Sequence, residues 1–364
     1  MNVKPRLFVD ARLQNSSGIG TYIRELVPRV ARQIGEDRCV VLAHDDDTGT
    51  FSDVRNFDAG VYSMKEQLLA LQLGVARGDV YWSPHYNMPA LLPARRLVTV
   101  HDVFHMAMPE FTQGVAKRLY ARTLFAAVRM RASKIICVSE FTANELTKFT
   151  GTLREKMRVI HNGLSLQWSL SPPMPRPHEK PYLLYVGNVK PHKNLGRLVD
   201  AFCKFDSGGL QLVIVGRREG FITGDASVVQ KAEQHGDKVS FTGLISDELL
   251  AAYYQHAHAL VAPSLYEGFG LPPLEAMAAG CPVVVSDIPA HREICGEAAL
   301  YFDPYSAGDI HDKLTQIKNM TGAERTGLAG VGKRRAAMFS WDRCAEETVE
   351  VIREVMDPRL AQGV

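Results

Sequence analysis

The sequence has no apolar run approaching the 18 residues expected of a membrane-spanning helix. Its first residues lead into a short apolar stretch that lacks the hydrophobic core of a signal peptide. Low-complexity tracts and short internal repeats are also missing. These absences argue against a membrane-embedded, fibrous or repeat protein, and they predict a protein that stays in the cytoplasm.

Cysteines are few and widely separated, and no Cys-x-x-Cys pair is present to hold zinc or to carry out redox chemistry. Reduced, structural thiols are therefore expected at all six positions. These positions are Cys39, Cys137, Cys203, Cys281, Cys295 and Cys344.

Strand-like and helix-like segments alternate along the 364 residues, a length that favours two domains at roughly 150 residues each. In the first half, strands are predicted at 6–10, 39–43, 80–83, 97–101, 134–138 and 158–160, with helices at 20–34, 114–131 and 143–149. A second series of strands follows at 182–186, 211–215, 239–241, 259–262 and 282–286. This alternation predicts an α/β fold with two Rossmann-like domains, each built on a parallel sheet covered by helices.

Four prolines between residues 172 and 177 separate the two series, and such a stretch can form neither a helix nor a central strand. We expect an N-terminal domain at 1–165, a proline-rich linker at 166–180 and a second domain at 181–340. A last helix, 343–356, follows Asp342, which is expected to cap it, and residues 341–364 are expected to return to the first domain. Parallel sheets bind ligands at the carboxyl ends of their strands, so function is expected there, in a cleft between the two sheets.

Charge is unevenly distributed, although the net charge is only +2. Residues 1–170 contain 22 Lys/Arg and 16 Asp/Glu, whereas the rest of the chain contains 20 and 24. A basic stretch, with no acid between Gln113 and Ser139, comprises Lys117, Arg118, Arg122, Arg129, Arg131 and Lys134.

The apolar residues of this basic stretch have roughly helical spacing and are expected to pack inward. They are Val115, Leu119, Leu124, Phe125 and Val128. The basic side chains then form either an ordinary solvated face or a surface that docks on anionic lipid. No nucleic-acid recognition motif accompanies them, so nucleic acid is not an expected partner.

The most informative segment is 264–280, Ser-Leu-Tyr-Glu-Gly-Phe-Gly-Leu-Pro-Pro-Leu-Glu-Ala-Met-Ala-Ala-Gly, which follows the strand predicted at 259–262. It places Glu267 in a glycine-rich loop and Glu275 in the first turns of a helix that begins at two prolines. The loop glycines let backbone amides approach a ligand, and the helix start offers unpaired N–H groups, so a diphosphate fits there. Carboxylates nearby would accept hydrogen bonds from vicinal hydroxyls of a sugar or a ribose. Spacing alone is also consistent with two glutamates that only cap a helix.

This segment resembles the Glu-x7-Glu region of retaining, two-domain glycosyltransferases of the family 4 type, related to bacterial mannosyltransferases and sucrose synthases. The resemblance extends over almost the whole chain through short motifs in family order, at 18–22, 100–102, 137–140, 160–163, 186–194 and 281–284. It implies the architecture called GT-B, in which two Rossmann-like domains face each other across a cleft.

By this resemblance, Glu275 is expected to hold the ribose hydroxyls of a sugar nucleotide. Lys193 is expected to neutralise the diphosphate as a catalytic residue. The transferred sugar is expected to contact Glu267 and the backbone amides of Phe269, Gly270 and Leu271.

The segment 186–194, which contains Asn188 among the expected donor-binding residues, departs from the family pattern in one respect. Many members place an arginine here beside the lysine to bind phosphate, and this segment has none. The second phosphate contact is therefore expected from Lys190, with His192 as the alternative.

Two residues of the first domain complete the expected site. Gly18 lies in a glycine-rich turn that opens a helix and resembles the glycine that faces the donor phosphates. His101 ends a predicted strand in Val-His-Asp, where the family has a histidine that meets the donor sugar, and its expected task is positioning and charge stabilisation. A structural histidine is the alternative at this strand end.

No metal and no other cofactor is expected, because the sugar nucleotide is a co-substrate and Lys193 supplies a cation for its diphosphate. Three consecutive acids, Asp45 to Asp47, could in another class of glycosyltransferases bind a divalent metal, but a run of like charges is usually a solvated loop.

The expected reaction is transfer of a hexose with retention of configuration, and segments 83–87 and 187–194 resemble those of bacterial polysaccharide mannosyltransferases. We therefore expect mannose from GDP-mannose to be transferred to a lipid-linked saccharide in polysaccharide or lipopolysaccharide synthesis. If the basic stretch docks on lipid, the protein is peripheral at the inner face of the membrane. The alternatives are a rhamnosyl-, glucosyl- or galactosyltransferase, a sugar-nucleotide epimerase of the same architecture, and a non-catalytic sugar-nucleotide sensor.

Overall fold

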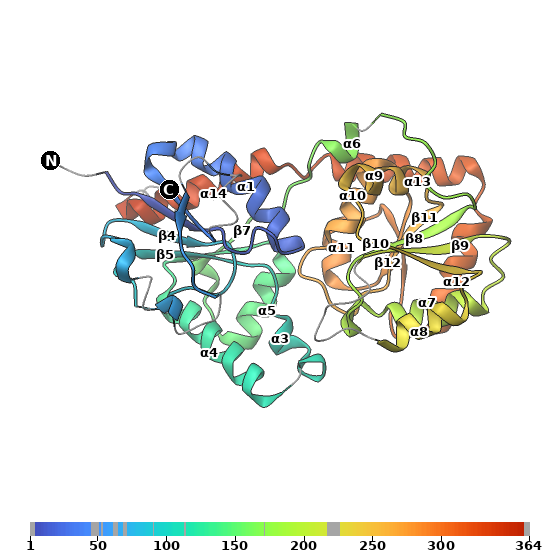
Figure 1. Cartoon of the computed structure of the whole chain (residues 1–364), viewed down its shortest axis with the longest axis horizontal. Coiled ribbons are helices and arrows are strands. Elements are labelled where there is room, and N and C mark those ends of the chain that lie inside the picture. The colour runs from blue at the N-terminus through green and yellow to red at the C-terminus, as the bar shows by residue number, and fades with distance from the viewer. Residues whose placement is uncertain are drawn as a thin grey trace. The chain divides into compact units, whose positions relative to one another are not determined.

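The computed structural model describes residues 4–44, 51, 54–60, 65–67, 71–89, 91–112, 114–170, 172–216 and 226–359. The chain divides into two compact units. Unit 1 comprises Met1–Gly163 together with Ser340–Val364, and unit 2 comprises Leu164–Phe339. Each unit contains one parallel sheet with helices, which confirms the predicted α/β class (Figure 1).

The described strands of unit 1 form a seven-stranded sheet in the order β3-β2-β1-β4-β5-β6-β7, and every neighbouring pair is parallel. The reversal between β1 and β4 is typical of Rossmann-like sheets, which bind ligands where the strand order changes direction. The strands are β1 (Leu7–Asp10), β2 (Cys39–Ala43), β3 (Val54–Asn56), β4 (Val80–Ser83), β5 (Arg95–Val100), β6 (Lys134–Cys137) and β7 (Met157–Val159).

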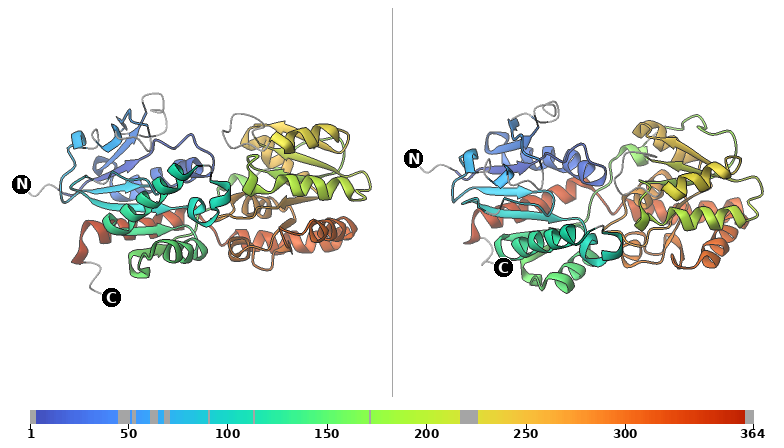
Figure 2. Two further views of the ribbon diagram at one scale, coloured as in Figure 1. Left: turned by 90° about the horizontal axis from the view of Figure 1, so that it is seen from below. Right: turned by 60° about the horizontal axis from the view of Figure 1, so that its bottom comes forward.

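Helices α1 and α14 pack on this sheet side by side, although one opens the chain and the other closes it (Figures 1 and 2). Both present apolar residues at helical spacing to a shared core, which includes Tyr22 and Leu26 of α1 and Val349 and Ile352 of α14. The described helices of unit 1 include α1 (Gly18–Ile34), α3 (Phe104–Ala107), α4 (Val115–Arg131), α5 (Glu140–Thr150) and α14 (Trp341–Met356).

The motif at 160–163 has a structural explanation in this unit. A Cβ atom added to Gly163 would lie 2.1 Å from the backbone nitrogen of Trp341, so only glycine lets the end of the first segment approach the start of α14. The helix itself begins differently from the prediction. Ser340, and not Asp342, is the N-cap, and its hydroxyl accepts hydrogen bonds from the backbone N–H groups of Asp342 and Arg343.

The described strands of unit 2 form a six-stranded parallel sheet in the order β10-β9-β8-β11-β12-β13. They are β8 (Tyr182–Val186), β9 (Gln211–Val215), β10 (Val239–Gly243), β11 (Ala259–Ala262), β12 (Val283–Ser286) and β13 (Ala299–Phe302). Its helices are α6 (Gln167–Leu170), α7 (Leu195–Lys204), α8 (Ala226–Gln234), α9 (Asp247–His256), α10 (Leu271–Ala279), α11 (Pro289–Cys295), α12 (Ala307–Asn319) and α13 (Gly322–Ala336). Helix α6 falls within the segment 166–180 and buries Trp168.

The expectation that five apolar residues of the basic stretch pack inward is wrong for two of them. Val115 and Leu119 of α4 are 72% and 61% exposed, whereas Phe125 and Val128 are buried. Ala121 is buried as well, and α3 and α5 both contact α4. In the described part of the chain, no helix is both long and apolar enough to cross a membrane.

Candidate active site

The loop that follows β11 holds Glu267 in an ion pair. Glu267 Oε1 lies 2.6 Å from Lys193 Nζ and accepts a hydrogen bond from the Ser264 hydroxyl at 2.7 Å. Burial alone would raise the pKa of Glu267, but the charge and hydrogen bond of Lys193 lower it to about 2. Two residues separated by 74 positions, and both predicted from the sequence, are thus in direct contact as an ionised pair.

Lys193 is positioned by the loop after β8, which is tied to the loop after β11. Its neighbour Asn194 has a positive φ of 58° and donates from its side-chain amide to the carbonyls of Pro263 and Pro304. The backbone N–H of Leu265 donates to the carbonyl of His192 at 2.8 Å. These bonds fix the two strand ends together, so the lysine and the glutamate are held by rigid elements rather than by free loops.

An arginine just after the segment 186–194 contacts the loop that carries Lys193. Arg197, in α7, donates to the Asn194 side chain at 2.6 Å and to the Pro304 carbonyl at 2.9 Å. It therefore supports the loop that carries Lys193. The Asn188 carbonyl accepts hydrogen bonds from the Tyr185 hydroxyl and from the Lys190 backbone, so both expected donor-binding residues lie in this loop as well.

Glu275 lies in the second turn of α10 and is partly buried. Its Oε2 accepts a hydrogen bond from the Tyr254 hydroxyl of α9 at 2.9 Å. Burial raises its pKa to about 7, and the nearby charge of Asp247 adds to the increase, while the Tyr254 hydrogen bond opposes it. The two glutamates thus have opposite environments. The surroundings of Glu267 stabilise its anionic form, whereas those of Glu275 raise its pKa to about 7 and favour its protonated form.

The start of α10 depends on Gly270, whose φ is 103°. A Cβ atom there would also come within 3.4 Å of the His291 ring. Phe269, just before it, is buried and packs edge-on against Phe339. Leu271 is the first residue of the helix, so the predicted amides of 269–271 lie at a helix N-terminus, where backbone N–H groups lack helical acceptors.

Unit 1 carries the remaining predicted residues. His101 directly follows β5, its Nε2 lies 2.8 Å from the Pro84 carbonyl, and its ring packs edge-on against Tyr22. Burial of the ring lowers the pKa of His101, which favours the neutral form with Nε2–H donating to Pro84. Gly18 is the first residue of α1, and a Cβ atom added there would meet nothing within 4 Å.

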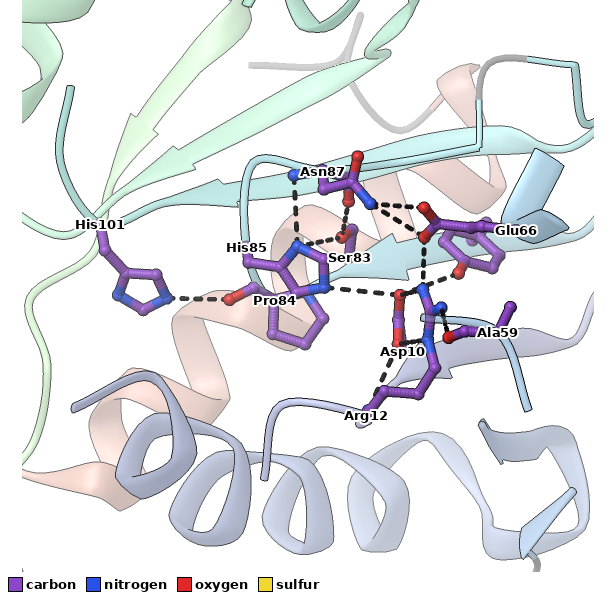
Figure 3. A network of polar contacts seen from close by, with 10 residues as sticks. Asp10, Arg12, Ala59, Glu66, Ser83, Pro84, His85, Asn87 and His101 are labelled. Carbon is purple, nitrogen blue, oxygen red and sulfur yellow. Dashed lines mark hydrogen bonds and ion pairs between the residues drawn. The ribbon is translucent and has the colours of Figure 1, made fainter. Parts of the chain in front are cut away.

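A buried polar network beside His101 was not predicted from the sequence (Figure 3). Arg12 is 4% exposed and lies between the carboxylates of Asp10 and Glu66. Both Glu66 oxygens accept from the Asn87 side chain, and the Asn87 backbone N–H donates to His85 Nδ1. His85 Nε2 lies 3.4 Å from Asp10 Oδ2, which closes a ring of five residues.

This ring fixes the turn that presents the Pro84 carbonyl to His101. Burial by itself would raise the pKa of Asp10, but Arg12 and His85 hold that pKa far below its usual value. The available signals were Asp10 at the end of a strand and the segment 83–87. Neither indicates its partners, because the contacts of Glu66 with Arg12 and Asn87 span 54 and 21 positions.

The structure places Lys193, Glu267, Glu275 and the start of α10 in unit 2, and Gly18 and His101 at strand or helix ends of unit 1. No group of three or more His, Cys, Asp or Glu side chains suited to a metal occurs among the described residues. The acidic run from Asp45 to Asp47 lies outside the described residues.

The family comparisons agree with this geometry. Residues 16–168 match the family described as Glycosyltransferase Family 4, and residues 167–328 match the family described as Glycosyl transferases group 1. The class is therefore a glycosyltransferase of the two-domain GT-B architecture.

Several solved structures share the fold. The structure of Anabaena HepE in complex with UDP and glucose has a TM-score of 0.77 and 16% identity, covering 96% of this chain and all of that one. WaaG, a glycosyltransferase involved in lipopolysaccharide biosynthesis, has a TM-score of 0.72 and 16% identity, covering 95% and 99% of the two chains.

Closer relatives in sequence include the O-antigen chain mannosyltransferase RfbU of Salmonella typhimurium, 32% identical over 70% of each chain. The O-antigen chain mannosyltransferase B of Escherichia coli is 26% identical over 75% of this chain and 74% of its own length. The protein belongs to the family 4 glycosyltransferases, and the prediction of a glycosyltransferase enzyme is confirmed.

Proposed function

We propose that the protein transfers mannose from GDP-mannose, with retention of configuration and without a metal, to a lipid-linked saccharide in O-antigen or related polysaccharide synthesis. The names of the two bacterial relatives support mannosyl transfer. The observation that carries the proposal is the contact of Lys193 with Glu267 beside the start of α10.

In the proposed reaction, Lys193 and the amides at the start of α10 stabilise the negative charge that grows on the departing diphosphate. Glu267, ionised in the free protein, accepts hydrogen bonds from hydroxyls of the transferred sugar, and Glu275 accepts those of the ribose. The diphosphate oxygen takes the proton of the acceptor hydroxyl, which attacks the sugar from the face that the leaving group vacates. The protein acts mainly by positioning the reactants and stabilising charge.

This proposal is tested by measuring release of nucleoside diphosphate with GDP-mannose and, in parallel, with UDP-glucose, in the presence of a lipid-linked saccharide and a metal chelator. Acceptor-dependent GDP release in chelator, with an α-linked mannoside identified by NMR, is the expected result. If UDP is released from UDP-glucose and no GDP is released from GDP-mannose, the transferred sugar is glucose and not mannose. Conversion of the free donor without an acceptor would indicate an epimerase, and binding without turnover a sensor.

We also propose that α4 docks the protein on anionic lipid. The helix exposes Val115, Leu119 and Met130, which are 72%, 61% and 68% exposed, next to the exposed Arg122 and Arg131. Exposed apolar side chains interleaved with arginines suit the boundary between headgroups and acyl chains, and basic residues near such a surface contribute about 1 kcal/mol each.

The docking test replaces Leu119 and Arg122 with Gln. Arg129 is left unchanged, because it donates to the Thr150 carbonyl and so has a structural role. Reduced and salt-sensitive binding to phosphatidylglycerol vesicles is expected, with transfer to a soluble acceptor analogue unchanged. The control is a double variant of unit 2, Lys204→Gln and Arg334→Gln, which changes two exposed basic residues outside α4. Equal vesicle binding by all variants would exclude α4 as the docking surface.

A further inference from the structure

Tyr254 is a buried residue outside every sequence motif discussed above, and it contacts Glu275 directly. Its side chain is fully buried, and its hydroxyl lies 2.9 Å from Glu275 Oε2. Burial and the neighbouring carboxylate raise the pKa of Tyr254 well above its usual value, so the phenol stays protonated. The hydroxyl is therefore the donor, and Glu275 Oε2 is the acceptor.

The ring of Tyr254 is held on its other side. Trp168 of α6 is 6% exposed and packs edge-on against it, with ring centroids 5.7 Å apart. A tyrosine confined in this way has little rotational freedom, so its hydroxyl defines where one oxygen of Glu275 lies.

The second carboxylate oxygen of Glu275 has a different environment. Within the described part of the chain, Oε1 has no hydrogen-bond partner and is not among the fully enclosed polar atoms without one. A carboxylate oxygen has two acceptor sites, so Glu275 can bind Tyr254 through Oε2 and still accept two hydroxyl donors. Two adjacent ribose hydroxyls match this remaining capacity.

We propose that Tyr254 is a positioning residue for nucleotide recognition, which orients Glu275 and keeps it able to accept hydrogen bonds from the ribose of the donor nucleotide. The inference rests on the proposed function of Glu275 as the ribose-binding carboxylate. It adds a residue of α9 that does not touch the ligand but acts through Glu275.

The charged groups around α10 determine how this role depends on pH. Asp247 of α9 raises the pKa of Glu275, and α6 contributes no titratable side chain. His291 of α11 lies near Glu267, and Lys333 of α13 near Gly280. The Tyr254 hydroxyl opposes the effect of burial on Glu275, so its removal is expected to raise the pKa of Glu275 above about 7.

The experiment measures binding of GDP and UDP by calorimetry from pH 6 to pH 9, in wild type, Tyr254→Phe, Glu275→Gln and the double variant. For whichever nucleotide wild type binds, Tyr254→Phe is expected to weaken binding about five- to tenfold at pH 7. The loss should shrink toward pH 9, where Glu275 is ionised in both proteins. Comparing variants cancels the titration of the nucleotide itself.

Tyr253→Phe is the matched control, because it removes a hydroxyl from the adjacent residue of α9. The Tyr182 hydroxyl donates to the Tyr253 backbone carbonyl, which this substitution leaves in place. It should bind as wild type does. In the Glu275→Gln background, Tyr254→Phe should change affinity less than twofold, and 2′,3′-dideoxy nucleotides should bind equally to wild type and Tyr254→Phe.

Unchanged affinity and pH dependence in a folded Tyr254→Phe protein would overturn the positioning role, as would an equal loss in Tyr253→Phe. A loss that persists without Glu275 would overturn it too, because the effect would then be one of general packing. If wild type binds neither nucleotide, the proposed function fails together with the inference.

Discussion

At the scale of single residues, Lys193 and Glu267 form a charged pair at the candidate site. Each group stabilises the other's charge, so neither carries an uncompensated, partly buried charge. A diphosphate that took over part of the Glu267 contact would meet Lys193 in an already fixed position. Lys193 would then need little movement during the proposed reaction.

Replacing Lys193 with Ala is expected to lower turnover at saturating donor by about a hundredfold, since loss of one preorganised electrostatic contact typically has an effect of this size. The reason is that diphosphate charge grows as the glycosidic bond breaks, so the lysine matters most in the chemical step. Steady-state kinetics of diphosphate release provide the measurement. Lys190→Ala serves as the comparison, and a larger loss in that variant would move the main phosphate contact to Lys190.

Glu275 makes the free energy of unfolding depend on pH. Its pKa is raised to about 7 in the folded protein, so between about pH 4.5 and pH 7 the unfolded chain releases this proton before the folded chain does. The free energy of unfolding therefore decreases as pH rises through this window. The contribution of Glu275 is least favourable above pH 7, where the ionised form that the proposed ribose contact needs is populated.

The variant Glu275→Gln is thus expected to be more stable than wild type at pH 8, by roughly 1–3 kcal/mol at 1.36 kcal/mol for each pKa unit. The gain should disappear at about pH 3.5, below the ordinary pKa of 4.5, where the carboxyl group is mostly protonated in both states. Urea unfolding at the two pH values measures the difference, with the exposed Glu346→Gln as control. A gain that is the same at both pH values would contradict the assignment of this titration to Glu275.

At the scale of elements, the carboxyl ends of β8 and β9 are held together by two glycines. A Cβ atom on Gly216 would lie 2.0 Å from the Gly187 carbonyl oxygen, a distance that no side chain can occupy without moving the backbone. The Gly187 backbone N–H also donates to the Val215 carbonyl at 2.9 Å. This close contact positions the start of the loop that leads to Lys193.

Gly216→Ala should therefore destabilise unit 2 by about 3 kcal/mol or more and displace the Lys193 loop, because the clash is with backbone and cannot be relieved by a side-chain rotation. Gly209→Ala is the matched control, since Gly209 also has a positive φ, 90°, but open space around its Cβ position. Thermal unfolding and nucleotide binding compare the two variants. Similar losses in both would mean that backbone φ, and not the contact with Gly187, is the cause.

Most strands could be predicted from the sequence because parallel strands buried on both faces are short, continuous apolar runs, as in β8, β9 and β11. Strand β3 was missed, since Val54–Asn56 is a partly exposed edge strand without such a run. Strand β13 was also missed, because Ala299–Phe302 is an edge strand of the unit 2 sheet in which only two of four residues are buried.

The candidate site was predictable to the extent that its residues lie in one continuous motif or follow a buried strand. Glu267 and Glu275 share one segment, so their place at a helix start could be derived, whereas the partners of Glu275 and Asp10 could not. Tyr254 and Arg12 reach them from other parts of the chain, and long-range side-chain contacts leave no periodic pattern in a sequence.

At the scale of the whole molecule, unit 1 is formed by two distant parts of the chain. Its sheet comes from the first 163 residues, while part of its core comes from α14, at the end of the chain. Arg95 of β5 donates to the carbonyls of Val355 and Met356, which satisfies two acceptors at the end of α14. We therefore expect folding of unit 1 to depend on α14, whereas the core of unit 2 is contained in one continuous stretch.

Two matched core substitutions are expected to separate the units. Ile352→Ala in α14 and Ile317→Ala in α12 each remove the same atoms from a fully buried site, and each should lower stability by about 2–5 kcal/mol. Hydrogen exchange followed by mass spectrometry should then show reduced protection of β1, β4 and β5 in Ile352→Ala, although these strands lie more than 250 positions from residue 352 in the sequence. In Ile317→Ala the loss should fall on β8, β9 and β12 instead. If Ile352→Ala reduced protection only within α14, the helix would be an independently detaching segment, and if both variants reduced protection in all strands equally, the two units would unfold as one.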